Sequence, residues 1–212
     1  MDIVVIGNGG HAKVILDLIE AAGLYRVIGY VDEKYERTSF EQGVFYTSFH
    51  SLDLKRLSPE CKVIIAIGDN LTRRKIYKKL ALSEEKFATL IHPTAVISPR
   101  ASIGPGSIIM ANAVIHADAN VGSQTIINTN SVVEHDCQIG DFVHLSPSAT
   151  LTGNVTIEDD VFIGAGSTVI PSVSVRKGSI IGAGSIVIKD VPPNRKAVGN
   201  PAVVLEKRKE GA

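Results

Sequence analysis

A cluster of polar side chains between positions 128 and 146 holds the residues best suited to moving a proton. Its members are Asn128, Asn130, Glu134, His135, Asp136, His144 and Ser146. Because an imidazole titrates near neutral pH, it can take a proton from an amine or hydroxyl that attacks an acyl donor. A carboxylate beside His135 would hold its tautomer, although in extended backbone that partner can come from another strand or chain. The cluster predicts acyl transfer with His135 as base, and a solvated surface histidine is the alternative.

A glycine-rich segment near the N-terminus is suited to binding phosphate groups. The segment Gly7-Asn8-Gly9-Gly10-His11-Ala12 follows one apolar run and precedes an amphipathic one, so backbone N–H groups at a helix N-terminus can face an anion. Asp32, Gly68 and Asn70 follow two further apolar runs at the same expected crevice. Only one such half is present, which favours a nucleotide-diphosphate ligand over NAD. A tight turn without a ligand is the alternative, and His11 either donates to a phosphate or caps the helix.

Basic residues gather near the C-terminus, where the chain turns repeatedly. They are Lys189, Arg195, Lys196, Lys207 and Arg208, and the turn Val198-Gly199-Asn200-Pro201-Ala202 lies among them. This positive charge is suited to the phosphates of a coenzyme. For the last three of these basic residues a solvated tail is the alternative.

The element that must position the polar cluster is a six-residue repeat. From Ile91 every sixth residue through Val187 is Ile, Val or Leu, and the fourth residue after each is small, from Ala95 to Val191. This period fits neither an α-helix nor strand alternation, but it fits short flat strands joined by tight corners around a prism. Glycines spaced 18 apart indicate three hexads per coil. Because aliphatic side chains fill the interior of such a prism, function is expected on its outer faces and corners.

Before Ile91 the sequence changes to alternating strand and helix signals, typical of a parallel α/β sheet. The apolar runs predict three strands and two helices, over 3–6, 27–31, 63–67, 12–22 and 71–82. The chain is thus expected to comprise a small Rossmann-like βαβ domain suited to a nucleotide-diphosphate ligand, a repeat domain that carries the acyl-transfer residues, and a basic turn and tail suited to a coenzyme, over 1–90, 91–190 and 191–212.

Composition narrows the class of protein. The 212 residues carry 22 basic and 22 acidic side chains, and no basic tract is interleaved with aromatics, which argues against nucleic-acid binding. The N-terminus shows no charged leader and no long apolar stretch, so a cytoplasmic protein without membrane insertion is expected. Cys61 and Cys137 give neither a disulfide framework nor metal-ligand spacing, and both are interpreted as core residues rather than nucleophiles. No metal is expected.

The hexads and the turn at 198–202 resemble the left-handed β-helix acyltransferases, which are typically trimers that use acetyl-CoA. A closer resemblance covers nearly the whole chain. It is to the PglD-type sugar-nucleotide acetyltransferases of bacillosamine biosynthesis, and it rests on Gly7-Asn8-Gly9-Gly10-His11, Tyr30-Val31-Asp32, Ile65-Ala66-Ile67-Gly68-Asp69-Asn70, Leu90-Ile91-His92-Pro93 and Val133-Glu134-His135-Asp136. Related proteins occur in exopolysaccharide clusters, and the group includes sialic-acid O-acetyltransferases. The resemblance implies a left-handed parallel β-helix of hexapeptide repeats and a homotrimer.

The resemblance also implies roles for individual residues. His135 matches the general base, and Asp136 stands where the bacillosamine enzyme has Glu. Residues near the acetyl thioester are matched by His144 and Asn128. The coenzyme groove is matched by Gly153, Ala165 and Ala183, to which the basic turn adds Lys189 and Pro201. The nucleotide-sugar pocket is matched by Gly10, His11 and Asp32, with Glu33 in place of a second Asp, and the expected substrate-binding set is completed by Gly7, Gly9, Gly68 and Asn70.

We therefore expect direct transfer of acetyl from acetyl-CoA to the 4-amino group of a UDP-amino-sugar. His135 would take the proton, and His144 would stabilise the oxyanion or fix the thioester. Three alternatives stay open at this point. They are a sugar O-acetyltransferase, a non-catalytic nucleotide-sugar sensor, and a metal-dependent γ-carbonic-anhydrase-like prism that uses His116, His135 and His144.

Overall fold

The N-terminal part of the chain folds around a five-stranded sheet. The computed structural model describes residues 1–52 and 57–205. The strands follow the order β3-β4-β2-β1-β5, and β4, β2, β1 and β5 are parallel. Their bounds are β1 Asp2–Ile6, β2 Arg26–Val31, β3 Ser39–Glu41, β4 Val44–Thr47 and β5 Lys62–Ile65. The expectation of three strands was too small, because the short, partly exposed β3 and β4 carry little of the apolar run that marks a buried strand.

One helix covers each face of this sheet. Helix α1 (Gly10–Ala22) buries Ala12, Ile15 and Leu18 against one side. Helix α2 (Asn70–Leu80) lies on the other side, where Leu80 joins the core formed by Val4, Ile6 and Ile65. A short 3₁₀ turn, η2 (Glu84–Lys86), then leads into the second domain. Both faces of β1 are buried, which explains its uninterrupted apolar sequence. No helix in the described part of the chain is long and apolar enough to cross a membrane.

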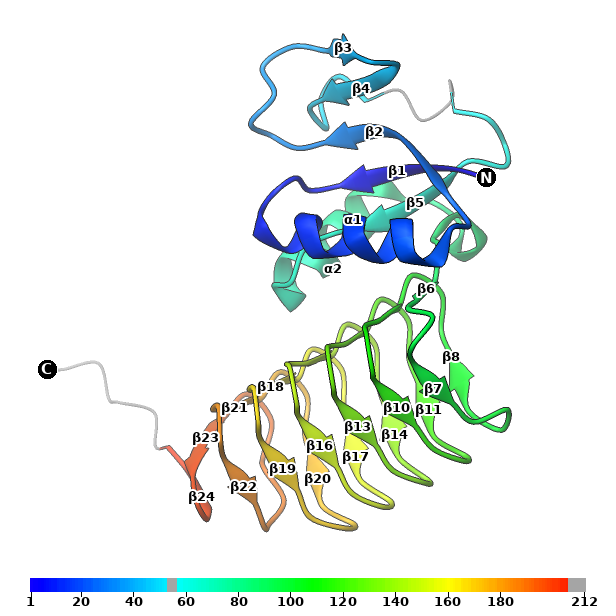
Figure 1. Ribbon diagram of the computed structural model, residues 1–212. Coiled ribbons are helices and arrows are strands. Elements are labelled where there is room, and N and C mark those ends of the chain that lie inside the picture. Colours follow the sequence, from blue (N-terminus) through cyan, green and yellow to red (C-terminus); the bar gives the residue numbers. More distant parts are fainter. Residues whose placement is uncertain (53–56, 206–212) are drawn as a thin grey trace, which may run out of the picture.

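The repeat region is a β-helix of parallel two-residue strands arranged in three sheets, as the hexads predicted (Figure 1). Face I consists of β6 Leu90–Ile91, β9 Ile108–Ile109, β12 Ile126–Ile127, β15 His144–Leu145, β18 Phe162–Ile163 and β21 Ile180–Ile181, extended by the hairpin β23 Lys196–Gly199 and β24 Ala202–Val204. Face II consists of β7 Val96–Ile97, β10 Val114–Ile115, β13 Val132–Val133, β16 Thr150–Leu151, β19 Thr168–Val169 and β22 Ile186–Val187. Face III consists of β8 Ser102–Ile103, β11 Asn120–Val121, β14 Gln138–Ile139, β17 Thr156–Ile157 and β20 Ser174–Val175.

The aliphatic residue of each hexad is buried inside the prism, except in the first coil. From Ile109 to Val187 every one of them is buried. Ile97 and Ile103 are only partly buried, and Ile91, which was expected to be interior, is 40% exposed. The first coil has no coil beneath it, so its inward residues are covered on one side only.

Each corner from residue 106 onward places one residue in the left-handed region of the backbone map. The positions recur every six residues and hold mostly Gly, Asn, Asp and Ser, the types that tolerate a positive φ. Gln124 and Phe142, both at φ 56°, are the exceptions. Phe142 is the bulkier of the two. It is buried because its ring contacts Tyr77 and Arg74 of α2, so domain packing offsets the unfavourable backbone conformation.

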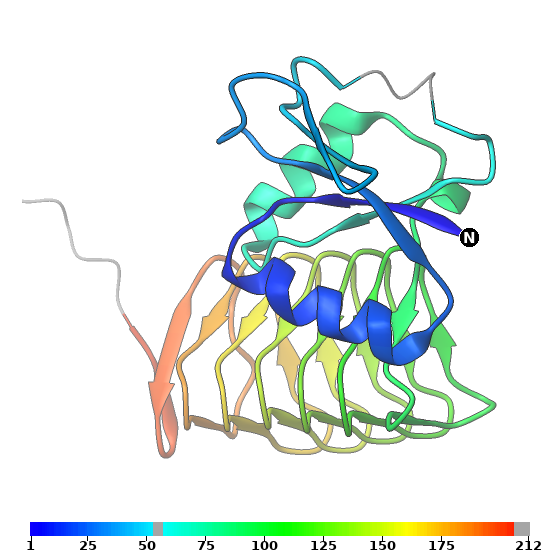
Figure 2. The ribbon, with the colours of Figure 1, turned by 45° about the horizontal axis from the view of Figure 1, so that its top comes forward.

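The α/β domain rests on face I. The outward residues Leu90, Ile108 and Ile126 of that face are buried in one cluster with α1 and β1. Burying each such side chain contributes roughly 1.5–3 kcal/mol to the junction. Figure 2 shows α1 lying across successive coils, and faces II and III meet on the side away from the α/β domain (Figures 1 and 2). The outward row of face I continues with His144, Phe162 and Ile180, where the cover ends and Ile180 is 39% exposed.

Candidate active site

His135 lies at the corner where face II passes into face III. Its Nδ1 is 2.7 Å from Oδ2 of Asp136, and both side chains are exposed. This hydrogen bond, with the charges of Asp136 and Glu134, raises the pKa of His135 above the ordinary imidazole value. An Nδ1–H that donates to Asp136 leaves Nε2 free to accept a proton. The geometry is that of a base oriented by a carboxylate, and it selects Asp136 rather than Glu134 as the partner; Glu134 instead lies 3.7 Å from Nε2 of His116.

Gly153, one coil further along the same corner, leaves room for the ring of His135. A Cβ atom at position 153 would lie 2.7 Å from both Nε2 and Cε1 of His135. Glycine is therefore required there for the imidazole to occupy its present place.

His144 lies on face I, in a different setting. It is 8% exposed, its Nδ1 is 3.0 Å from the carbonyl oxygen of Gly68, and its Nε2 is 3.1 Å from Nδ2 of Asn128. A carbonyl only accepts, so Nδ1 carries the hydrogen and Nε2 accepts from the asparagine amide. Burial lowers the pKa of His144 to about 4, which keeps the ring neutral. With both nitrogens bonded, neutral His144 has no N–H left for an oxyanion, and Asn128 becomes the donor nearest that role.

The predicted catalytic histidines are not brought together within one chain. His135 lies at the corner between faces II and III, whereas His144 lies on face I, which that corner opposes across the prism. His116, in the third alternative, shares the corner of His135. Among residues 1–52 and 57–205, no group of three His, Cys, Asp or Glu side chains could hold a metal ion.

The glycine-rich loop joins the end of β1 to α1, as expected. Gly7 has φ 96°, and a Cβ there would lie 2.8 Å from Cγ1 of Ile67, so no other residue fits. The carboxylate of Asp32 accepts from the backbone N–H of Asn8 at 2.7 Å and of Lys34 at 3.1 Å. Asp32 thus braces the loop from within.

Gly9 caps α1 and Gly10 begins it, and a Cβ at either position would meet no atom within 4 Å. The helix N-terminus is therefore open to a ligand, as a phosphate site requires. His11 follows in the first turn, with its ring centroid 6.2 Å from that of His144. Burial and the nearby Arg73 lower the pKa of His11, and its buried Nε2 has no partner among the described residues.

Two members of the expected substrate set have other tasks in the structure. Asn70 is buried; its amide donates to the backbone oxygens of Asp160 and Val161, and its Oδ1 accepts from Arg73. Its side chain thus joins α2 to the β-helix. Glu33 is exposed and lies 3.5 Å from Nζ of Lys79. Position after a strand predicted proximity to the crevice, but it could not show that these side chains already have partners.

Sequence reasoning also missed Lys34, whose Nζ donates to the backbone oxygen of Asn8 at 2.6 Å. This contact puts a cation beside the glycine-rich loop. The signal available was weak, since a single lysine after Asp32 resembles any exposed charge.

The expected coenzyme contacts fall in three places. Ala165 and Ala183 lie in successive coils at the corner between faces I and II, where both are exposed, and Asn128 lies at the same corner two coils before Ala165. Gly153 lies beside His135 at the corner between faces II and III. The repeat glycines move to this corner as well: Gly104, Gly122 and Gly140 lie between faces III and I, whereas Gly164 and Gly182 lie between faces I and II. Small residues therefore occupy this corner in the last coils. Lys189 and Pro201 line a hollow of about 320 Å³ beside the β23–β24 hairpin, and the tail from residue 206 lies outside the described residues.

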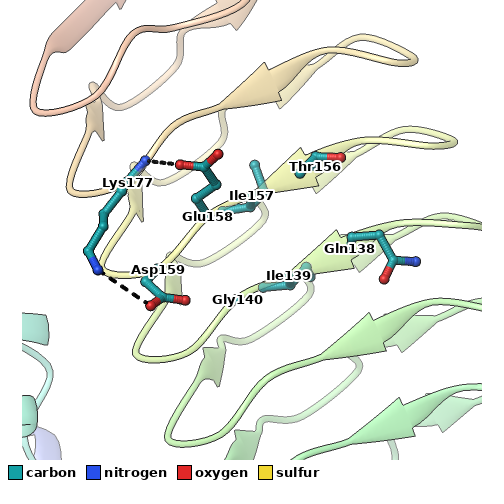
Figure 3. Close-up of a pocket in the computed structure, with 8 residues that line it drawn as sticks. All are labelled: Gln138, Ile139, Gly140, Thr156, Ile157, Glu158, Asp159 and Lys177. Atoms are coloured by element: carbon teal, nitrogen blue, oxygen red, sulfur yellow. Dashed lines mark hydrogen bonds and ion pairs between the residues drawn. The ribbon is translucent and has the colours of Figure 1, made fainter.

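Other features are less suited to catalysis. The hollow of about 420 Å³ on face III, shown in Figure 3, is lined by none of the expected site residues. Its charged groups already have partners: Glu158 accepts from Arg176 and from the backbone N–H of Lys177, and the Lys177 ammonium lies 3.7 Å from Asp159. Cys137 is buried, and burial raises the pKa of its thiol, so it is no nucleophile.

A β-helix with an α/β domain over one face, an oriented exposed histidine and a phosphate-type loop defines a hexapeptide-repeat acyltransferase architecture. Residues 2–80 match the PglD N-terminal domain, and residues 154–189 match the hexapeptide repeat of succinyl-transferase. The structure of PerB from Caulobacter crescentus, in complex with CoA and GDP-perosamine, is 36% identical, with a TM-score of 0.87, and the match covers 97% of this chain and 98% of that one.

A second structure, the acetyltransferase domain of PglB from Neisseria gonorrhoeae FA1090 in complex with acetyl coenzyme A, is 36% identical with a TM-score of 0.85 over 96% of this chain and 98% of its own. UDP-N-acetylbacillosamine N-acetyltransferase of Bacillus subtilis (strain 168) is 43% identical over 113 residues, which is 52% of this chain and 51% of that protein. The alignment thus spans about half of this curated relative. The chain belongs to the PglD-type family of sugar N-acetyltransferases.

Proposed function

We propose that this protein transfers the acetyl group of acetyl-CoA to the amino group of a nucleotide-linked 4-amino sugar, with UDP as the first nucleotide to test. The observation that carries the proposal is the pairing of two features. An open phosphate-type loop lies beside His144, and an exposed imidazole, His135, is oriented by a carboxylate. Relatives named for perosamine and bacillosamine act on amino sugars, which supports an amine acceptor.

In the proposed reaction, the sugar amine attacks the thioester carbonyl while Nε2 of His135 takes its proton. Asn128 donates to the oxygen that becomes negative in the tetrahedral intermediate. Collapse of the intermediate breaks the C–S bond and releases coenzyme A as its thiolate, which receives the proton from the His135 imidazolium. The products are the N-acetylated nucleotide sugar and free coenzyme A. No acyl-enzyme and no metal take part.

The proposal includes a homotrimer, because one chain does not complete the site. The nucleotide loop and His144 share one side of the prism, whereas His135 projects from the opposite corner. A neighbouring copy must therefore bring its own His135 to the loop of this chain. A cytoplasmic location and a role in exopolysaccharide or other surface-glycan synthesis are part of the same proposal.

The direct test is release of free thiol from acetyl-CoA against a panel of UDP-amino-sugars and GDP-perosamine. We expect release with a 4-amino nucleotide sugar and none with the matching 4-hydroxy compound. Release with hydroxyl acceptors alone would replace the proposal by sugar O-acetylation. Binding of the nucleotide sugar in calorimetry without binding of coenzyme A would replace it by a non-catalytic sensor.

Subunit complementation tests the shared site. A His135→Ala chain lacks the base, and a Gly10→Asp chain places a carboxylate at the phosphate loop. At nucleotide-sugar concentrations near the wild-type KM, each homo-oligomer should have little activity. Co-refolded mixtures should regain activity, because some junctions then pair an intact His135 with an intact loop. Mixtures that stay inactive would show that each chain supplies its own complete site.

A further inference from the structure

Among residues 1–52 and 57–205, Arg73 is the largest side chain that is fully buried, and it lies where the two domains meet. Its Nε donates to the backbone oxygen of Gln124 at 2.8 Å, and one terminal nitrogen donates to Val143 O at 3.2 Å and to Oδ1 of Asn70 at 2.8 Å. The other terminal nitrogen donates to Ile67 O at 3.0 Å and Gly68 O at 3.1 Å. Every N–H group of the guanidinium thus has an acceptor.

Burial lowers the pKa of Arg73 to about 10, so it remains charged at neutral pH. A buried charge bonded only to uncharged oxygens is a costly way to hold two domains together, since apolar residues already seal the junction. The arrangement has a more specific consequence at Gly68.

The carbonyl of Gly68 accepts from two side chains, Arg73 and Nδ1 of His144. The Arg73 fork holds this oxygen in one position, and the oxygen then requires a hydrogen on Nδ1 of His144. The remaining nitrogen, Nε2, must accept, and it does so from Nδ2 of Asn128. The orientation of that amide is fixed independently, because the backbone N–H of Thr129 donates to Oδ1 of Asn128 at 2.8 Å.

One hydrogen of the Asn128 amide is therefore used by His144, and no acceptor among the described residues bonds the other. We propose that Arg73 is a positioning residue: through Gly68 it holds His144 in the Nδ1–H tautomer, and His144 aims the free N–H of Asn128 at the acetyl oxygen. The inference rests on the proposed function for the identity of that oxygen. It also links the loop that ends β5, beside the nucleotide site, to the group that contacts the acetyl donor.

The tautomer can be measured without any substrate. Protein labelled with ¹⁵N-histidine is studied by long-range ¹H–¹⁵N correlation spectra, with the His144 signals assigned from their loss in His144→Gln. We expect a protonated Nδ1 and an unprotonated Nε2 in the wild-type protein. The opposite tautomer in the wild type would overturn the inference.

Arg73→Lys keeps the charge but loses the fork, so it can no longer hold every carbonyl at once. We expect its His144 signals to show a mixture of both tautomers and its kcat to fall roughly tenfold, as for a small misplacement of a positioned group. Arg74→Lys is the matched control. Arg74 joins the same helix to the same corner, through Asp160 at 2.6 Å and the Phe142 ring, but it does not touch Gly68 or His144. Wild-type tautomer and kcat in Arg73→Lys would overturn the inference.

A purely structural role of Arg73 makes a different prediction, namely equal losses of melting temperature and kcat in the two lysine variants. A further variant, His144→Asn, retains a donor for Gly68 but removes the acceptor for Asn128. If Arg73 acts through His144, the double variant Arg73→Lys/His144→Asn should lose no more kcat than the less active of the two single variants. Additive losses would contradict the inference. If no sugar in the panel is acetylated, the proposed function is overturned. The tautomer measurement still tests whether Arg73 positions His144.

Discussion

The two histidines of the polar cluster show how one side chain serves two purposes in the same prism. His144 is buried, neutral and bonded at both nitrogens, whereas His135 is exposed, bonded to Asp136 through Nδ1 alone, and has a raised pKa. A base must exchange protons with a substrate, so it needs a free nitrogen and a carboxylate that stabilises its cation. A positioning group needs the reverse, a single tautomer that does not change with pH. Under the proposed function, this contrast assigns proton transfer to His135 at the corner and donor alignment to His144 at the domain junction.

The sharpest test of this contrast removes the base. His135→Ala should lower kcat by roughly 10²–10⁴-fold, the usual contribution of a positioned general base, with little change in affinity for acetyl-CoA. Steady-state thiol release and calorimetry with coenzyme A measure the two quantities. His116→Ala, on the same corner, should stay close to wild type. Near-normal turnover of His135→Ala would remove His135 from the mechanism.

A variant at Gly10 tests the phosphate site of the α/β domain, beside which His144 lies. Because a Cβ there meets no atom and acidic residues favour a helix N-terminus, Gly10→Asp should fold at least as well as the wild type. Its carboxylate would repel the diphosphate, so we expect the KM for the nucleotide sugar to rise by roughly two orders of magnitude while the KM for acetyl-CoA is unchanged. Gly10→Asn adds nearly the same bulk without charge and should cost much less. Equal effects of the two variants would indicate a steric change instead of a phosphate site.

A variant at Gly153 tests whether the present position of the His135 ring is the catalytic one. Gly153→Ala puts a methyl group 2.7 Å from the imidazole of His135, so the ring must move. We expect kcat to fall roughly tenfold with normal thermal stability, since the ring is exposed and can turn away. Ala117→Gly, on the same corner one coil before His135, removes a methyl group and should have little effect on kcat. A fully active Gly153→Ala would show that the present ring position is not the catalytic one.

The prism could be predicted from the sequence because its physics is periodic. One aliphatic per hexad must fill the interior, and one residue per corner must accept a positive φ, so both constraints repeat until they are unmistakable. The same regularity predicted that functional side chains lie on the outer faces and corners, and His135 lies at such a corner. By contrast, Arg73 is an ordinary charged residue in a helix sequence, and nothing local shows that it is fully buried. Its role depends on backbone oxygens at 124 and 143, which come from the other domain.

The fate of Asn70 and Ile91 has a similar cause. Asn70 follows a strand at the crevice, but its amide donates to two backbone oxygens of the β-helix. The sequence alone does not show that these oxygens lie beside it. Ile91 keeps the hexad phase, but the prism ends there and leaves its side chain partly uncovered. Periodic sequence signals predict elements well, whereas contacts between the two domains and the ends of a repeat depend on the assembled structure.

The smallest expected effect concerns Asp136, the carboxylate that raises the pKa of His135. The proposed base works only when neutral, so activity should fall as pH drops through the pKa of His135, which Asp136 raises. Asp136→Asn removes the negative charge, the pKa of His135 returns toward its ordinary value, and the acid limb of the kcat/KM profile moves to lower pH.

Asn fits this corner because position 136 has φ 62°, a conformation that Asn tolerates as well as Asp, so the turn itself is preserved. Glu134→Gln removes a charge that acts on His135 through space alone and should move the acid limb less. An acid limb that does not move in Asp136→Asn would mean that the titrating base is a different group. A limb that moves while the plateau falls only modestly would show that Asp136 tunes the proton affinity of the base more than its orientation.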